Sequence, residues 1–135
     1  MKGLLKMFKK NLLIFGFFIS PLVFSNPVYL DCSISDGTRF SLKIDEQSNS
    51  VTHSGGNGSG SVLQGLFQAN NIAYQQVALI NGLKVTIHYN IDRTDLSIVK
   101  TFSLEPVDAR AKIKTKQTTT HPGQCAVSKT SDQKI

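Results

Sequence analysis

The sequence predicts an all-β fold: an antiparallel meander that curls into a small sandwich or barrel, closed by one disulfide bond. The first observation is an alternation of apolar and polar side chains, clearest between residues 83 and 104. A period of two places one face of a strand in a core and the other in water. The second observation is a set of turn signals such as Asn81-Gly82 and Asp36-Gly37. The third is a pair of cysteines, Cys32 and Cys125, near the two ends of the expected domain.

The second half of the chain carries the strongest strand signals. Apolar residues occupy every second position of 83–91, and the alternation resumes over 96–104. The polar run 92–95 between these segments predicts a turn. Residues 72–77 alternate in the same way and lead into Asn81-Gly82, a pair typical of tight hairpins. We therefore expect three strands here in up-and-down order.

The first half predicts shorter strands. Residues 28–35 alternate, Asp36-Gly37 marks a turn, and residues 40–44 form the next strand. Residues 51–53 begin a short third strand, and β character resumes over residues 62–68. Strands of this length joined by Asp-Gly turns are antiparallel neighbours.

A glycine- and serine-rich segment, residues 54–61, interrupts these strands. Glycine at this density predicts a mobile loop. The segment lacks the Gly-Lys-Ser/Thr ending of a phosphate-binding loop. It is a plain linker or a binding finger, because loops on rigid scaffolds often carry function. A further alternative is N-glycosylation at Asn57-Gly58-Ser59, in a source that has the machinery. The candidate contact residues of such a finger are Asn57, Ser59 and Ser61.

A second candidate surface lies near the C-terminus. Basic side chains occupy every second position of residues 110–116, namely Arg110, Lys112, Lys114 and Lys116. In an extended chain all four project from one face and form a basic ridge for an anionic partner such as lipid phosphate or an acidic protein. The alternative is an edge strand whose lysines discourage aggregation. Nucleic acid is not expected as a partner, since no aromatic side chain lies nearby to stack on bases.

The N-terminus predicts export. Four lysines (Lys2, Lys6, Lys9 and Lys10) precede the apolar run 11–19, and short residues lead to a cleavage site after Ser25. We therefore expect a signal peptide over residues 1–25 and a periplasmic or secreted product. The alternative is an uncleaved membrane anchor, but Ser20-Pro21 leaves the apolar run short for a span.

The remaining chain is one domain's worth of sequence. We expect a single β-domain over residues 26–127 and a flexible C-terminal tail over residues 128–135. The whole sequence has 15 basic and 9 acidic residues, which gives a net charge of +6. Because the expected signal peptide holds four of the basic residues, the processed chain carries 11 − 9 = +2. We expect no membrane span after processing and a monomeric product.

The cysteines and histidines favour a structural role over chemistry. In an oxidising compartment two cysteines allow one intramolecular pairing, so we expect a Cys32–Cys125 disulfide. No Cys-x-x-Cys pair occurs, and the three histidines lack ligand spacing, so no metal or cofactor is expected. No Gly-x-Ser-x-Gly elbow occurs either, and the acidic residues mostly fall in predicted turns. We therefore expect a protein that is not an enzyme.

Two resemblances accompany these patterns. The export signal, the first strand with Tyr29-Leu30-Asp31-Cys32, the meander and the late cysteine resemble the periplasmic inhibitors of c-type lysozyme, and Gly58-Ser59-Gly60-Ser61 is similar to their Ser-Gly-Ser-Gly loop. That resemblance implies insertion of the loop into a lysozyme cleft.

A second resemblance runs from Tyr29 to Cys125. The hairpin Ile91-Asp92-Arg93-Thr94 and the terminal Gly123-Gln124-Cys125 are similar to small exported β-proteins of Gram-negative bacteria, which implies a fold and a compartment but no activity.

The function expected from the sequence is therefore non-catalytic binding of a protein or another envelope component, outside the cytoplasm. The first alternative is inhibition of c-type lysozyme through the glycine- and serine-rich loop. The second alternative is a structural role at the envelope, with the basic ridge directed toward anionic lipid.

Overall fold

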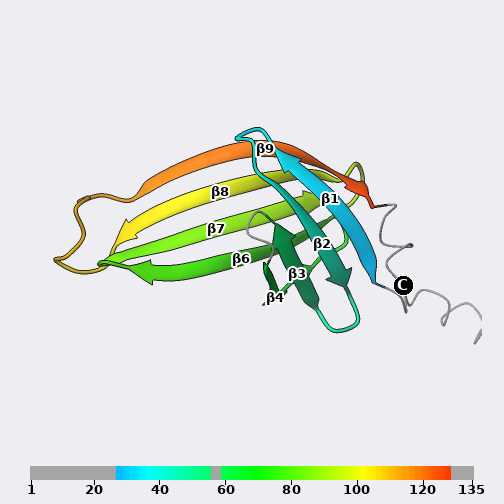
Figure 1. Ribbon diagram of the computed structural model, residues 1–135, viewed down its shortest axis with the longest axis horizontal. Helices are drawn as coiled ribbons and strands as arrows, with labels where there is room; N and C mark the ends of the chain where they lie inside the picture. Colours follow the sequence, from blue (N-terminus) through cyan, green and yellow to red (C-terminus); the bar gives the residue numbers. More distant parts are fainter. Residues whose placement is uncertain (1–26, 56–58, 129–135) are drawn as a thin grey trace, which may run out of the picture.

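The fold is a single nine-stranded antiparallel sheet, seen in a computed structural model that describes residues 27–55 and 59–128 (Figure 1). The strands are β1 (Val28–Ile34), β2 (Arg39–Asp45), β3 (Ser50–Gly55), β4 (Ser59–Gln64), β5 (Leu66–Phe67), β6 (Asn71–Ile80), β7 (Leu83–Asp92), β8 (Ser97–Pro106) and β9 (Gln117–Val127). Their spatial order is β4-β3-β2-β1-β9-β8-β7-β6-β5. The predicted all-β meander is confirmed.

The sheet closes almost completely on itself. Strands β1 to β4 and β6 to β9 each follow one another as hairpins, and β9 returns to pair with β1 in the middle of the sheet. At the other side β4 approaches β6, so that the nine strands form a barrel-like shell. This arrangement pairs neighbouring strands antiparallel without a long crossover connection.

The core follows directly from the alternation of side chains. In β1 and β2 every second residue is buried, and the same holds for the end of β7. At the start of β6 Ile72 and Tyr74 face the core, and Ala73 between them is buried as well. We call the face that these residues share the inner face of the sheet. Its buried members are Leu30, Cys32, Ile34, Phe40, Leu42, Ile44, Val51, Ile72, Tyr74, Tyr89, Ile91, Ile98 and Cys125.

The predicted disulfide is confirmed. Cys32 in β1 and Cys125 in β9 lie directly opposite each other on the inner face, and their sulfur atoms are bonded. The bond joins residues 93 positions apart, and a loop of that length stabilises a fold by up to about 4–5 kcal/mol in the chain-entropy model. The disulfide therefore fixes the strand pair at which the two ends of the domain meet.

The two halves of the sheet differ in length. Strands β1 to β4 have six or seven residues, whereas β6 to β9 have ten or eleven. The longer strands therefore extend beyond the shorter ones toward the connection between β8 and β9, at the left of Figure 1. We call this extension the open half of the sheet.

Two segments differ from the sequence-based expectation. Residues 54–61 are not one long loop, because Ser54 and Gly55 end β3 and pair with Gly60 and Ser59 of β4. Gly55 also has a packing role: a Cβ there would lie 2.5 Å from the Cβ of Phe40. Its backbone therefore passes directly over the Phe40 side chain, which only glycine permits.

The other difference concerns residues 109–116, which form no strand. They belong to an irregular connection, residues 107–116. The prediction of an extended strand that projects four basic side chains from one face is therefore wrong.

The domain bounds predicted from the sequence, residues 26–127, stay a prediction. The expected signal peptide, residues 1–25, lies outside the described residues. Ser128, expected as the first residue of the tail, is buried, and its backbone N–H donates to the carbonyl of Tyr29 at 2.8 Å. The rest of the expected tail, residues 129–135, also lies outside the described part of the chain.

Candidate functional site

The inner face of the open half carries apolar side chains that β1 to β4 do not cover. Cross-strand neighbours in the register, such as Ile87 and Phe102 or Val85 and Leu104, lie on the same face as the core pair Ile91 and Ile98. We call this surface the open face. It consists of Ala78, Ile80, Leu83, Val85, Ile87, Phe102, Leu104 and Pro106.

The residues of the open face lie in line with the core residues but are exposed to solvent. Ile91 and Ile98 are 0% and 1% exposed, whereas the residues of the open face are all partly or fully exposed, and Ile80 reaches 53%. Ile87 still packs against the core cluster and so links the two regions. Contiguous apolar side chains that a soluble domain leaves in water commonly mark a binding surface. The open face is therefore our candidate functional site.

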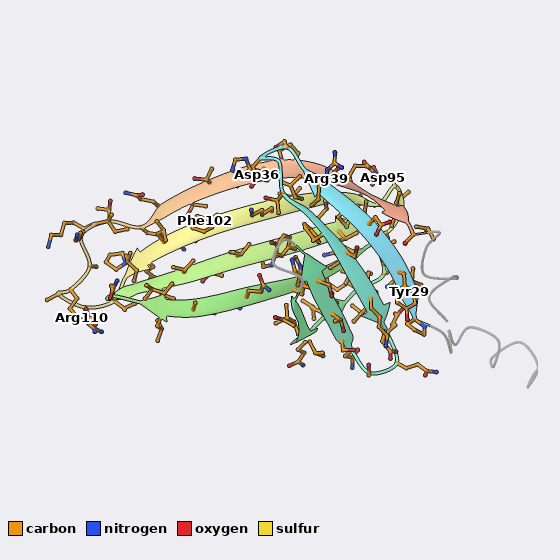
Figure 2. All side chains as sticks on the ribbon, viewed as in Figure 1. Tyr29, Asp36, Arg39, Asp95, Phe102 and Arg110 are labelled. Atoms are coloured by element: carbon orange, nitrogen blue, oxygen red, sulfur yellow. A yellow bond between two sulfur atoms is a disulfide. The ribbon has the colours of Figure 1, made fainter. Side chains whose placement is uncertain are left out.

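An ion pair marks the border between the covered half and the open face. Lys100 projects from the inner face of β8, opposite Tyr89, and its Nζ lies 2.8 Å from Oδ2 of Asp36. The two side chains are only 13% and 23% exposed. Hydrogen bonds from Lys100 and from Thr38 hold the pKa of Asp36 well below its usual range. Asp36 belongs to the turn between β1 and β2, so the pair fixes this turn over the inner face (Figure 2).

Four rings form the wall of the core beside this ion pair. Phe40 stacks on His53 with ring centroids 4.3 Å apart, and Tyr74 stacks on Tyr89 at 4.8 Å. His53 Nδ1 and the Tyr74 hydroxyl share a hydrogen bond of 2.9 Å. Burial is the main reason why the pKa of His53 is lowered and the pKa values of both tyrosines are raised. Neutral imidazole and protonated phenols are therefore favoured here, and the described residues leave no buried side-chain polar atom unpaired.

Chemically, this aromatic cluster is suited to structure more than to reaction. The Tyr74 hydroxyl and the His53 imidazole hold one another by a hydrogen bond, and Lys100 is held by Asp36 and Thr38. A general base needs a free lone pair near a space that admits a substrate. The cluster instead provides a polar, well-packed boundary from which the open face begins.

The connection 107–116, which we call the basic loop, lies at the far end of the open half, where Arg110 is labelled in Figure 2. It is anchored to the turn between β6 and β7: Val107 N–H donates to the Gly82 carbonyl at 2.9 Å, and Ala111 is buried. Gly82 has a φ of +82°, and a Cβ there would lie 2.7 Å from the backbone nitrogen of Ala111. Glycine is therefore required at this contact.

The four basic residues of the predicted ridge are not equivalent. Arg110 forms an ion pair of 2.9 Å with Asp108, which is the main reason why the pKa of Asp108 is lowered. Lys112, Lys114 and Lys116 are exposed, and they form no salt bridge with any described residue. The loop therefore offers three lysines to solvent at the end of the open face.

The structure separates the two candidate surfaces predicted from the sequence. Asn57 lies outside the described residues, Ser59 begins β4, and Ser61 is exposed on β4 opposite His53. These serines thus belong to a paired hairpin in the covered half, whereas the basic loop lies at the end of the open half. The disulfide cysteines are buried and structural.

Sequence reasoning missed the open face itself. The signal that could have found it is the unequal length of the alternating segments, which are about ten residues long after position 71 and about seven before position 45. In a curled sheet, shorter strands cannot cover the whole inner face of longer ones.

A small cavity lies at the opposite end of the shell. It has a volume of about 200 Å³, and its apolar lining includes Leu30, Ile44, Ile72, Ile91 and Leu96. Arg93 and Glu46, which form an ion pair of 2.9 Å, lie at its edge.

Within residues 27–55 and 59–128, no group of three or more His, Cys, Asp or Glu side chains is placed to hold a metal ion. The same residues contain no helix long and apolar enough to cross a membrane. No protein-family model, no curated protein and no solved structure matches the chain.

Proposed function

We propose that this chain is a non-catalytic binding protein that works outside the cytoplasm and binds an anionic amphiphile of the cell envelope. The acyl chain lies along the open face, and the acidic headgroup meets the basic loop. The observation that carries the proposal is the continuity of these two surfaces. The apolar open face ends at the β6–β7 turn, and the basic loop with the exposed Lys112, Lys114 and Lys116 packs against that turn.

The compartment is supported by two independent features. Residues 1–25 have the charge and hydropathy pattern of a signal peptide. The Cys32–Cys125 disulfide persists in oxidising environments and is rare in a reducing cytosol. An envelope component is therefore an accessible partner.

The dimensions of the open face suit an acyl chain. The strands extend about six residues past Tyr89 before the β6–β7 turn, which corresponds to about 20 Å at about 3.4 Å per residue. Each methylene that leaves water contributes about 0.8 kcal/mol, so even partial cover of such a chain gives measurable binding. Exposed lysines add about 1 kcal/mol each near an anionic lipid surface.

Vesicle sedimentation tests the apolar part of the proposal. We expect the processed protein to sediment with phosphatidylglycerol vesicles, and Phe102→Asp to weaken this binding about tenfold or more, because the carboxylate must leave water on the open face. The matched control is Val99→Asp, which places the same charge on the opposite face of β8. Equal binding by the two variants would exclude the open face.

A second arm tests the charged part and the source of the amphiphile. The triple variant Lys112→Glu, Lys114→Glu and Lys116→Glu should lose its preference for phosphatidylglycerol over phosphatidylcholine. A dansylated undecanoic acid titrated in the absence of vesicles reports binding of a free amphiphile. Binding of neither vesicles nor the dansylated acid at micromolar protein would refute the proposal.

Lysozyme inhibition is the alternative that the resemblance implies, and it depends on a different surface. The hairpin between β3 and β4 would enter the enzyme cleft. An assay of c-type lysozyme on a cell-wall suspension, with the wild-type protein and with Ser59→Trp, distinguishes this alternative. Inhibition that Ser59→Trp removes and Phe102→Asp leaves intact would favour it over amphiphile binding.

A further inference from the structure

One edge of the sheet is left open over most of β6. Strand β5 pairs only with Ile72 and Ala73 of β6, whereas β7 pairs with the whole strand. From Gln75 to Ile80, therefore, no strand within the described residues pairs with the outer edge of β6. This edge is independent of the open face, because it consists of backbone groups that lie in the plane of the sheet.

The hydrogen bonds near the start of β6 identify the backbone groups that point outward. The carbonyl of Asn71 accepts from Gln68 on the outer side, and the carbonyl of Asn70 accepts from Arg93 on the β7 side. Since successive residues of a strand alternate in this respect, Gln75, Val77 and Leu79 direct their N–H and C=O groups outward.

This edge lacks the features that normally prevent association. Natural edge strands carry charges, prolines or bulges, but residues 75–80 contain no charged residue and no proline. Val77, Leu79 and Ile80 are 50%, 72% and 53% exposed. An uncharged edge of six residues, four of them apolar, that no described strand pairs with is a template for a further strand.

We propose that this strand comes from a second copy of the chain, so that the protein forms a symmetric dimer through β6. An antiparallel pair centred on Val77 places Val77 opposite Val77 of the second copy and Gln75 opposite Leu79 of the second copy. All the outward-directed backbone groups then face each other and form about six hydrogen bonds. This differs from the monomer expected from the sequence.

A hollow beside Gln75 supports a second copy as the partner. A cavity of about 410 Å³ lies at the start of the free edge, lined by Gln64, Gly65, Leu66, Ala73, Tyr74, Gln75 and His88. In the symmetric register, the exposed Leu79 of the second copy stands next to Gln75 on the face that bears His88. In the dimer, the Leu79 side chain of each copy therefore fills the hollow of the other copy and leaves water.

The charge distribution also permits two copies to meet. Residues 26–135 carry a net charge of only +2. On the face of the sheet that bears the Val77 side chain, the ionisable residues nearest to this edge are Lys84 and His88. Both lie one strand away, on β7. A two-fold pair uses the free edge of both copies, so the assembly closes as a dimer and does not grow into a fibre.

Sedimentation-velocity centrifugation of the processed protein from about 1 μM to about 1 mM tests the proposal. We expect a concentration-dependent dimer and at least a tenfold weaker association for Val77→Lys, which places two lysines opposite each other. The control is Thr86→Lys, which carries the same charge on the same face but on β7, directly beside Val77. This control should dimerise like the wild-type protein.

A proline variant tests whether the backbone edge of β6 is responsible for dimerisation. Val77→Pro removes only an outward N–H, so it should be monomeric with an unchanged circular dichroism spectrum. A wild-type protein that stays monomeric up to about 1 mM would overturn the proposal, and so would a dimer that persists in folded Val77→Lys and Val77→Pro. Phe102→Asp should dimerise normally, since it changes only the open face.

Discussion

Lys100 lies on the inner face of β8, beside the core, and Asp36 supplies the opposite charge there. The ion pair of 2.8 Å neutralises both charges at the border of the core. Hydrogen bonds to charged partners contribute about 1.5–3 kcal/mol each, more than exposed ion pairs do. The Asp36-Gly37 turn was predictable as a turn, but the partner of its carboxylate was not, because Lys100 is 64 positions away.

His53 predicts how stability depends on pH. Its pKa in the folded protein is lowered, mainly by burial and further by Lys100, so the unfolded chain binds more protons below about pH 6.5. The free energy of unfolding should therefore decrease as the pH falls from 7 to 5. The slope from this one group cannot exceed about 1.4 kcal/mol per pH unit.

Urea unfolding at pH 5, 6 and 7 measures this effect. His53→Gln should flatten the dependence, while Tyr74→Phe should lower stability at pH 7 by removing the hydrogen bond to His53 and keep the slope. A pH profile of His53→Gln parallel to that of the wild type would show that His53 is not responsible.

Asp36 contributes in a separate pH window. Its lowered pKa adds stability above about pH 3.8, and this stability is lost on further acidification.

At the scale of the elements, Gly55 distinguishes a packed hairpin from a flexible linker. A Cβ at this position would lie 2.5 Å from the Cβ of Phe40, so Gly55→Ala should destabilise the fold by about 1–3 kcal/mol. In a linker, the same substitution would stabilise slightly, by about 0.4–1 kcal/mol, because alanine restricts the unfolded chain. The two interpretations therefore predict opposite signs.

Thermal and urea unfolding of Gly55→Ala and of Thr52→Ala, on the other face of β3, provide the comparison. The packing account expects Gly55→Ala to be clearly the less stable of the two. A Gly55→Ala protein more stable than the wild type would restore the linker interpretation of residues 54–61.

The strands and the disulfide could be predicted because their signals are local or unique. Alternation over 83–91 states which side chains share a face, and two cysteines allow only one pair. Alternation does not state what covers that face. The exposure of Phe102 and Leu104 depends on how far β1 to β4 reach across the curled sheet, which is a property of the whole fold.

The basic loop shows another limit of sequence patterns. Lysines at every second position are compatible with a strand and with an irregular loop. The Asp108–Arg110 pair and the burial of Ala111 against the β6–β7 turn stabilise the loop here. The Asp108–Arg110 pair is local, but Ala111 and Gly82 are 111 − 82 = 29 positions apart, so a local pattern could not have predicted their contact.

At the scale of the whole molecule, one curled sheet provides two different regions. The covered half holds the core, the disulfide and the aromatic cluster, and so fixes the curvature. The open half extends from it with an apolar face, a basic end and an edge that no strand of the described chain pairs with. The amphiphile binding that we propose uses the face, and the dimerisation that we propose uses the edge, so Phe102→Asp and Val77→Lys should affect them separately.

Methyl NMR with a spin-labelled fatty acid tests the central claim most directly, because the label broadens only nearby signals. The account predicts selective broadening of the methyl groups of Val85, Ile87 and Leu104, with Val99 on the other face of β8 unaffected. Broadening confined to Leu30 and Ile72, which line the small cavity at the opposite end, would contradict it, and so would no selective broadening at all.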